Sequence, residues 1–161
     1  MIEMYAEFHR KKDKFGGDSL GVHIPEIGEL IAETGSKTIL DYGCGRARHY
    51  EGGLPEKWGV SANFYDPAVE RFSAKPEGKF DGVICTDVLE HILDPEEALE
   101  EIVGYATKFC FLSISCRPSN SNKKLSDGTE FHISIHHPSW WRERLEKFSG
   151  VKIVARFDVE G

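Results

Sequence analysis

The chain has 161 residues, 40% hydrophobic and 29% charged, a balance typical of one globular domain, so we treat residues 1–161 as a single domain. Its 20 Lys and Arg residues against 27 Asp and Glu residues give a net charge of −7, which argues against a nucleic-acid partner because nucleic acids are normally bound by a basic surface. No run approaches the ~18 consecutive apolar residues that a membrane-spanning helix needs, so no membrane association is expected.

The first part of the chain predicts two helices and one buried strand. Residues 3–14 read as a polar helix without the apolar core of a secretory signal, and residues 1–20 are interpreted as this helix and a possible lid. Residues 24–35 place apolar side chains at helical spacing, with Gly35 as a plausible C-cap. The stretch KTILDYG (37–43) is then typical of a short buried strand.

The middle of the chain continues the alternation of helices and strands. We expect a short helix over 47–51, a loop over 52–59 and a strand over 60–66 that ends on an aspartate. A brief helix over 67–74 begins with a proline, which suits the first helical position. The stretch KFDGVICTD (79–87) predicts the third strand.

The last part predicts a helix over 95–106, a strongly apolar strand over 108–115 and a long polar segment over 116–137. A helix over 138–148 and a strand over 151–159 follow. Strands that alternate with helices indicate an α/β fold with a mostly parallel sheet and helices on both faces.

Three aspartates, Asp41, Asp66 and Asp87, fall at or near the carboxyl ends of predicted strands. Ligands of such sheets bind outside these ends, where the strand order reverses. Three carboxylates on one rim therefore indicate a binding site. The alternative is that aspartate simply favours turns and helix caps at such positions.

The turn after the first strand contains Gly43 and Gly45, which allow a ligand to approach the backbone closely. A dinucleotide-binding fingerprint would need a third glycine at position 48, which is Arg48, and no Gly-Lys-Ser/Thr of a phosphate loop follows. An acid at the strand end instead suits a ligand that carries a cation or a ribose diol near the turn.

The stretches LDYGCG, FYDPAV and FDGVICTDVLEHILDPEEALEEI resemble the successive motifs of class I S-adenosylmethionine-dependent methyltransferases. The chain is thus identified as a small, minimal member of the bacterial or phage type. The resemblance implies a Rossmann-like fold and S-adenosyl-L-methionine as the cofactor. It also implies a cofactor pocket that consists of Asp41, Tyr42, Gly43, Cys44, Gly45, Asp66, Pro67, Thr86, Asp87 and Val88, in which Asp66 would hold the ribose hydroxyls.

The sequence also departs from the pattern of this family. Only 13 residues, Pro67 to Lys79, separate Asp66 from the third strand, where most relatives fit a further strand. The last predicted strand, 151–159, is followed by no closing antiparallel strand. We therefore expect a reduced sheet that lacks one strand between the second and fourth family strands, and a more exposed adenine.

Methyl transfer requires the donor and the nucleophile to be held in line, with a base where the acceptor carries its proton at neutral pH. The candidate bases are His91, His132 and His136. His91 has two alternative roles: a fold-supporting one, and metal binding with Asp87 and Glu90, to which some metal-dependent O-methyltransferases add a later histidine. We predict no metal.

Further residues have both a functional and a structural interpretation. Trp140 or Trp141 could form an apolar wall of the substrate cleft or anchor their helix on the core. Arg46 and Arg48 could pair with an acidic substrate group or simply face water. The residues Phe15, Ser19 and His23 could belong to a lid over the cofactor or to a helix cap.

The four cysteines form no Cys-x-x-Cys pair, which favours reduced thiols and a cytoplasmic protein. The predicted function is methyl transfer to an oxygen or nitrogen of a small molecule, by a monomer or weak homodimer. The alternatives are a cofactor-binding protein without transfer activity and a nucleic-acid methyltransferase.

Overall fold

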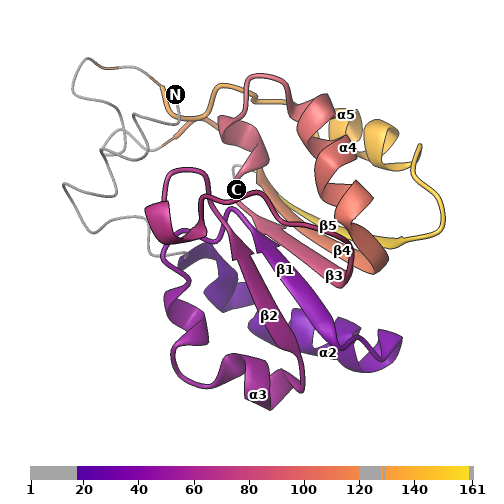
Figure 1. Cartoon of the computed structure of the whole chain (residues 1–161). Helices are drawn as coiled ribbons and strands as arrows, with labels where there is room; N and C mark the ends of the chain where they lie inside the picture. Colours follow the sequence, from indigo (N-terminus) through magenta and orange to yellow (C-terminus); the bar gives the residue numbers. More distant parts are fainter. Residues whose placement is uncertain (1–17, 120–127, 129, 160–161) are drawn as a thin grey trace.

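The computed structural model describes residues 18–119, 128 and 130–159. Five strands form one sheet in the order β2-β1-β3-β4-β5 (Figure 1). All four pairings are parallel, which confirms the predicted α/β fold. The expected helix over 3–14 lies outside the described residues. The strands are β1 (Thr38–Tyr42), β2 (Ser61–Tyr65), β3 (Phe80–Thr86), β4 (Ala106–Ser115) and β5 (Lys152–Asp158).

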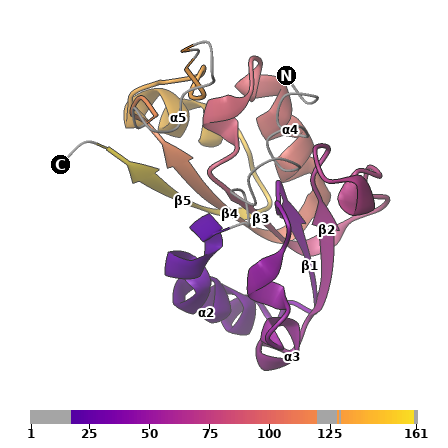
Figure 2. The ribbon, with the colours of Figure 1, turned by 90° about the vertical axis from the view of Figure 1, so that its left-hand side faces the viewer.

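Helices cover both faces of the sheet. Figure 2 shows α2 and α3 on one face and α4 and α5 on the other. Each of these helices has a proline in its first turn, where its missing N–H costs nothing. The helices are α2 (Ile24–Thr34), α3 (Leu54–Trp58), α4 (Pro95–Tyr105) and α5 (Pro138–Leu145), with 3-10 segments η1 (Asp18–His23), η2 (Arg48–Tyr50), η3 (Glu70–Phe72) and η4 (Leu89–His91).

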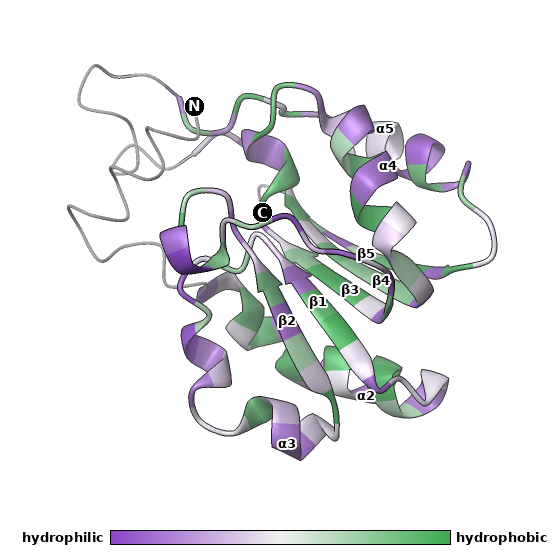
Figure 3. Cartoon of the chain, viewed as in Figure 1, coloured by the Kyte–Doolittle hydropathy of each residue, from purple (hydrophilic) through white to green (hydrophobic). Residues whose placement is uncertain are grey.

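The core consists of two apolar layers separated by the sheet. Because successive side chains of a strand point to opposite faces, Val83 and Leu112 pack under α4 and α5, whereas Ile84 and Phe111 pack under α2. All four side chains are fully buried. Burial on both faces explains why β3 and β4 have nearly continuous apolar sequences, which Figure 3 shows as hydrophobic bands along the central strands.

Helix α2 and the expected Gly35 cap are confirmed: Gly35 has a left-handed conformation, and its N–H donates to the carbonyl of Ala32. Two other expectations are wrong. Residues 52–59 do not form a loop throughout, because Leu54 is buried and anchors the short helix α3. The expected helix over 67–74 is only the 3-10 turn η3, because the N–H of Asp66 bonds to the carbonyl of Phe72 and closes the segment on itself.

The sheet is reduced as expected. Residues 66–79, all described, contain no strand, and β3 follows β2 through η3 alone. Strand β5 lies parallel to β4, without an antiparallel strand between them. In the part of the chain that the structure describes, no helix combines the length and the apolar character needed to cross a membrane.

Candidate functional site

The chain leaves β1 through a turn that requires glycine. Gly43 and Gly45 have φ of 82° and 56°, in the left-handed region. The N–H of Gly43 donates to the carbonyl of Tyr65 at 2.7 Å and so ties the turn to the end of β2. A Cβ on Gly43 would lie 2.3 Å from a methyl carbon of Val88, so close packing as well as backbone conformation excludes a side chain there.

Asp66, directly after β2, holds the turn from its other side. Its Oδ2 accepts a hydrogen bond from the N–H of Gly45 at 2.8 Å, and its Oδ1 accepts one from the N–H of Ala68 at 2.9 Å. A carboxylate has about four acceptor positions, so both oxygens can accept further donors. The ribose-binding role that the family resemblance implies for Asp66 stays a prediction.

Asp41 lies inside the rim, 3% exposed. Its Oδ2 accepts a hydrogen bond from the Tyr50 hydroxyl at 2.8 Å, whereas its Oδ1 is buried without a hydrogen-bond partner among the described residues. Burial raises the pKa of Asp41 to about 7, against the lowering effect of the Tyr50 hydrogen bond. A buried carboxylate oxygen without a donor is costly unless a ligand supplies a donor or a cation.

The end of β3 contributes Thr86 and Asp87. The hydroxyl of Thr86 lies 2.9 Å from that of Ser19, which attaches η1 to this rim. Asp87 has φ of 53°, unusual for a residue with a side chain, and its Oδ1 accepts a hydrogen bond from the Ser113 hydroxyl at 2.9 Å. Burial raises the pKa of Asp87, and the Ser113 hydrogen bond opposes this effect.

The other residues predicted for the cofactor pocket occupy different environments. The ring of Tyr42 packs against that of Tyr65, with centroids 4.9 Å apart, in the core layer under α4. Cys44 is 2% exposed, and burial raises the pKa of its thiol, which makes it a poor nucleophile. Pro67 is exposed beside Asp66.

Two of the three candidate bases lie together. The rings of His91 and His132 are 4.9 Å apart in an edge-to-face arrangement. Nδ1 of His91 is 2.8 Å from the carbonyl oxygen of Phe131, and Nδ1 of His132 is 2.6 Å from that of Arg117. A carbonyl accepts only, so each neutral ring carries its proton on Nδ1 and its lone pair on Nε2.

Glu90 lies beside this pair and is fully buried. Its Oε1 accepts a hydrogen bond from the N–H of Ser115 at 3.2 Å, and its Oε2 has no hydrogen-bond partner among the described residues. Burial, followed by repulsion from Asp87, raises the pKa of Glu90 to about 8. Its own carbonyl accepts from the N–H groups of Ile133 and Ser134, which joins η4 to the histidine-containing segment.

The residues Glu90, His91 and His132 fit a divalent cation. One ligand atom from each lies within 4.8 Å of the other two. Metal-binding histidines usually donate their second ring N–H to a carbonyl or carboxylate, which both of these rings do. The sequence matched Asp87 to this set and left the later histidine unnamed; the structure supplies His132, whereas Asp87 bonds to Ser113 and is not part of this cluster.

His136, the third candidate base, lies elsewhere. The ring of His136 stacks on that of Trp140, with centroids 3.7 Å apart and planes 8° from parallel, and the guanidinium carbon of Arg144 lies 3.4 Å from the centroid of the Trp140 ring. The structure therefore groups His136 with α5 and not with His91. Trp141 is fully buried and anchors α5 on the core, as the structural interpretation of this pair expected.

Sequence reasoning missed three groups around the rim. Tyr50, in η2, is the hydrogen-bond partner of Asp41, and only their spacing across the glycine turn could have indicated it. The Ser113 hydroxyl donates to Asp87, and the backbone N–H of Ser115 donates to Glu90. A signal was available only for Ser113, a polar side chain near the carboxyl end of an otherwise apolar strand, because the bond of Ser115 comes from its backbone.

A family model described as a methyltransferase domain matches residues 23–148, which is most of the chain and includes Asp41, Asp66, Asp87 and Glu90. The chain therefore belongs to this methyltransferase family, as the sequence motifs predicted, and is an enzyme of methyl transfer. Neither a curated protein sequence nor a solved structure shows a significant match to it.

Proposed function

We propose that this chain uses S-adenosyl-L-methionine as its methyl donor and transfers the methyl group to an oxygen or nitrogen of a small molecule. The observation that carries the proposal is the buried Oδ1 of Asp41, which has no donor within the described residues and lies at the exit of β1. The ammonium group of a methionine moiety would supply that donor. Asp66 directly follows β2, which neighbours β1 on the side away from β3, and it offers acceptor positions for a ribose diol.

The chemistry that such a donor supplies is an activated methyl group on a sulfonium. The acceptor's lone pair forms the new bond to carbon while the carbon–sulfur bond breaks, and the sulfonium becomes a neutral thioether. Where the acceptor is a hydroxyl, its proton must leave. Nε2 of His91 or of His132 carries a lone pair that can take this proton.

Titration of the chain with S-adenosylhomocysteine by calorimetry tests donor binding. Asp41→Asn keeps the shape of the side chain and removes its charge, and we expect a loss of affinity of at least about tenfold. Asp81→Asn is the matched control, because Asp81 lies at the start of β3, at the opposite end of the sheet. Absence of heat with the unaltered chain, or equal affinity for both variants, contradicts the proposal.

Methylation of a nucleic acid is the alternative to a small-molecule acceptor, and the acidic composition disfavours it. Incubation with a methyl-labelled donor and fractionated extracts separates them. Label in small-molecule fractions supports our proposal. Label only in RNA or DNA supports the alternative.

A second candidate function is metal-assisted O-methylation. It is favoured by the cluster of Glu90, His91 and His132, whose ligand atoms lie within 4.8 Å of one another. A divalent cation there would lower the pKa of an acceptor hydroxyl, so that no protein base would be required. Two imidazoles and one carboxylate suit first-row transition metals better than magnesium.

Cobalt(II) titration followed by visible absorption tests this candidate without reference to activity. We expect a saturable d–d absorption that His132→Asn and Glu90→Gln abolish. His136→Asn is the matched control, since His136 lies against Trp140 and outside the cluster. An absorption spectrum that is insensitive to His132→Asn, or no spectrum at all, excludes a metal at this cluster.

A further inference from the structure

The outer edge of β2 is a surface that the methyl-transfer site does not use. In the described part of the chain, β2 pairs with β1 only. The N–H of Ser61 donates to Lys37 and the carbonyl of Tyr65 accepts from Gly43, so the odd-numbered residues of β2 bond toward β1. In a strand the intervening residues point their backbone groups the other way, so Ala62 and Phe64 present N–H and C=O groups away from the sheet.

This edge is short and has defined ends. The N–H of Val60 donates to the carbonyl of Pro55, and the N–H of Asp66 donates to the carbonyl of Phe72, each at 3.0 Å. Between these two bonds, Ala62 and Phe64 have no backbone partner strand in the described residues. Exposed edges of this kind are usually protected by proline, lysine or a bulge, and the stretch SANFY contains none of these.

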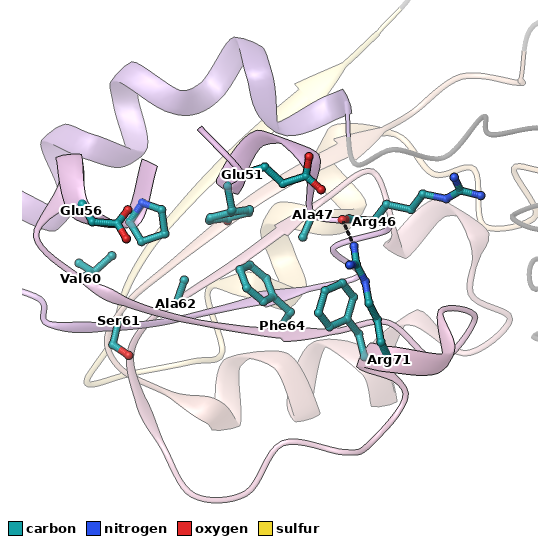
Figure 4. Close-up of a pocket in the computed structure, with 12 residues that line it drawn as sticks. Arg46, Ala47, Glu51, Glu56, Val60, Ser61, Ala62, Phe64 and Arg71 are labelled. Carbon is teal, nitrogen blue, oxygen red and sulfur yellow. Dashed lines mark hydrogen bonds between the residues drawn. The ribbon is translucent and has the colours of Figure 1, made fainter. Parts of the chain in front are cut away.

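The edge also borders a cavity of about 560 Å³ on the face of the sheet that carries α3 (Figure 4). Its floor is apolar: the rings of Phe64 and Phe72 have centroids 5.2 Å apart, and Ala62 and Val60 continue the floor toward α3. Tyr50, the hydrogen-bond partner of Asp41, lines this cavity, whereas Asp41, Asp66 and Glu90 do not. Apolar surface beside unpaired backbone is the combination that an added strand would cover.

Opposite charges flank the two ends of the edge. Figure 4 shows Glu56 beside Val60 at the start of β2, and Arg71 beyond Phe64 at its other end. Arg71 donates to the carbonyl of Arg46 and lies over the ring of Phe72, with 4.5 Å between its guanidinium carbon and the ring centroid, so its charge is held in place. When two copies of this edge lie antiparallel, the Glu56 end of one copy lies beside the Arg71 end of the other. The edge is therefore complementary in charge to a second copy of itself.

We propose that the β2 edge pairs with the β2 edge of a second copy of this chain, antiparallel and with the two-fold axis at Asn63. Ala62 then lies opposite Phe64 of the partner subunit, so that a small side chain faces a large one on both sides of the axis. These two pairs exchange four backbone hydrogen bonds. Glu56 faces Arg71 of the partner subunit at each end, and the two sheets become one continuous sheet.

Sedimentation across a concentration series from about 5 to about 500 μM tests the proposal, because a two-residue ladder gives a small interface and a dissociation constant on the order of 10 to 100 μM. The informative variant is Ala62→Pro. Proline removes an N–H that points away from the sheet, so the monomer can keep its fold. We expect dimerisation to weaken at least about tenfold, since two of four ladder bonds are lost.

Ala62→Val is the matched control, because it keeps the N–H, and it should still dimerise; circular dichroism checks that both variants are folded. Glu56→Arg and Arg71→Glu should each weaken the dimer, and the double variant should recover it. A chain that stays monomeric throughout the series overturns the proposal. So does a dimer that Ala62→Pro leaves unchanged, which would place the interface elsewhere.

Discussion

At the scale of single residues, Asp41 is the group whose ionisation should be coupled to ligand binding. Its pKa of about 7 in the ligand-free chain means that roughly half of the molecules carry a neutral Asp41 at that pH. A ligand ammonium favours the carboxylate and lowers this pKa. We therefore expect the affinity for S-adenosylhomocysteine to rise with pH through about 7, and binding to release a proton.

Calorimetry in two buffers of different ionisation enthalpy counts these protons at about pH 6.5. The Asp41→Asn variant should bind S-adenosylhomocysteine weakly, and the proton that Asp41 releases in the unaltered chain should be missing. Affinity that is constant between about pH 6 and about pH 8 would show that the ligand's cation does not meet Asp41.

Gly43 supports a second prediction at this scale. Gly43→Ala forces a side chain into the left-handed region and places its Cβ 2.3 Å from Val88. We expect a loss of about 2 to 4 kcal/mol in the free energy of unfolding, from strain and overpacking together. Urea denaturation measures it.

Val88→Ala in the same chain separates the two contributions. It removes the methyl groups that the new Cβ meets, so the double variant should recover the packing part and keep the backbone part. If Gly43→Ala is as stable as the unaltered chain, the turn does not have the conformation described here.

The sequence singled out Asp41, Gly43 and Asp66 because they lie at or directly after the carboxyl end of a strand, and their ligand-binding roles stay predictions. It did not predict the buried Oδ1 of Asp41 or the bond from Tyr50, since these depend on how η2 folds back over the turn. It also did not identify His132 as the histidine beside His91, because tertiary structure decides which residue of a distant segment packs there.

At the scale of elements, η1 is attached to the end of β3 by one side-chain contact and one apolar anchor. The hydroxyls of Ser19 and Thr86 are 2.9 Å apart, and Leu20 is 2% exposed. Ser19→Ala should cost about 1 kcal/mol, the usual net value of such a hydrogen bond. The measurement is urea denaturation.

A double-mutant cycle with Thr86→Val isolates the contact itself. The coupling energy should be about 1 kcal/mol, because each single variant already loses the bond. Additive effects of the two substitutions would show that the hydroxyls do not interact.

Long elements with strong apolar periodicity were predictable, and short ones were not. Helix α2 and strands β3 and β4 each bury several side chains, so their sequences carry the pattern. Helix α3 buries Leu54 alone and gives no periodic signal. For 67–74, the proline predicted the start of a helix, but the bond between Asp66 and Phe72 leaves only the three-residue 3-10 turn η3.

At the scale of the whole molecule, two buried carboxyl groups govern how stability depends on pH. The pKa of Asp41 is about 7 and that of Glu90 about 8, both well above the values near 4 expected in the unfolded chain. The folded state therefore binds these protons more tightly than the unfolded state. The associated stability is fully present below about pH 4 and is lost as the pH rises through about 8.

We expect the free energy of unfolding of the unaltered chain to fall by a few kcal/mol between about pH 6 and about pH 8.5, measured by urea denaturation. Glu90→Gln keeps an acceptor for the N–H of Ser115 and cannot ionise, so its pH dependence should be distinctly shallower. Glu97→Gln, at an exposed position of α4, should follow the unaltered chain. Parallel curves for the unaltered chain and Glu90→Gln would mean that Glu90 is ionised in the folded chain at neutral pH, and that its Oε2 has found a cation or another donor.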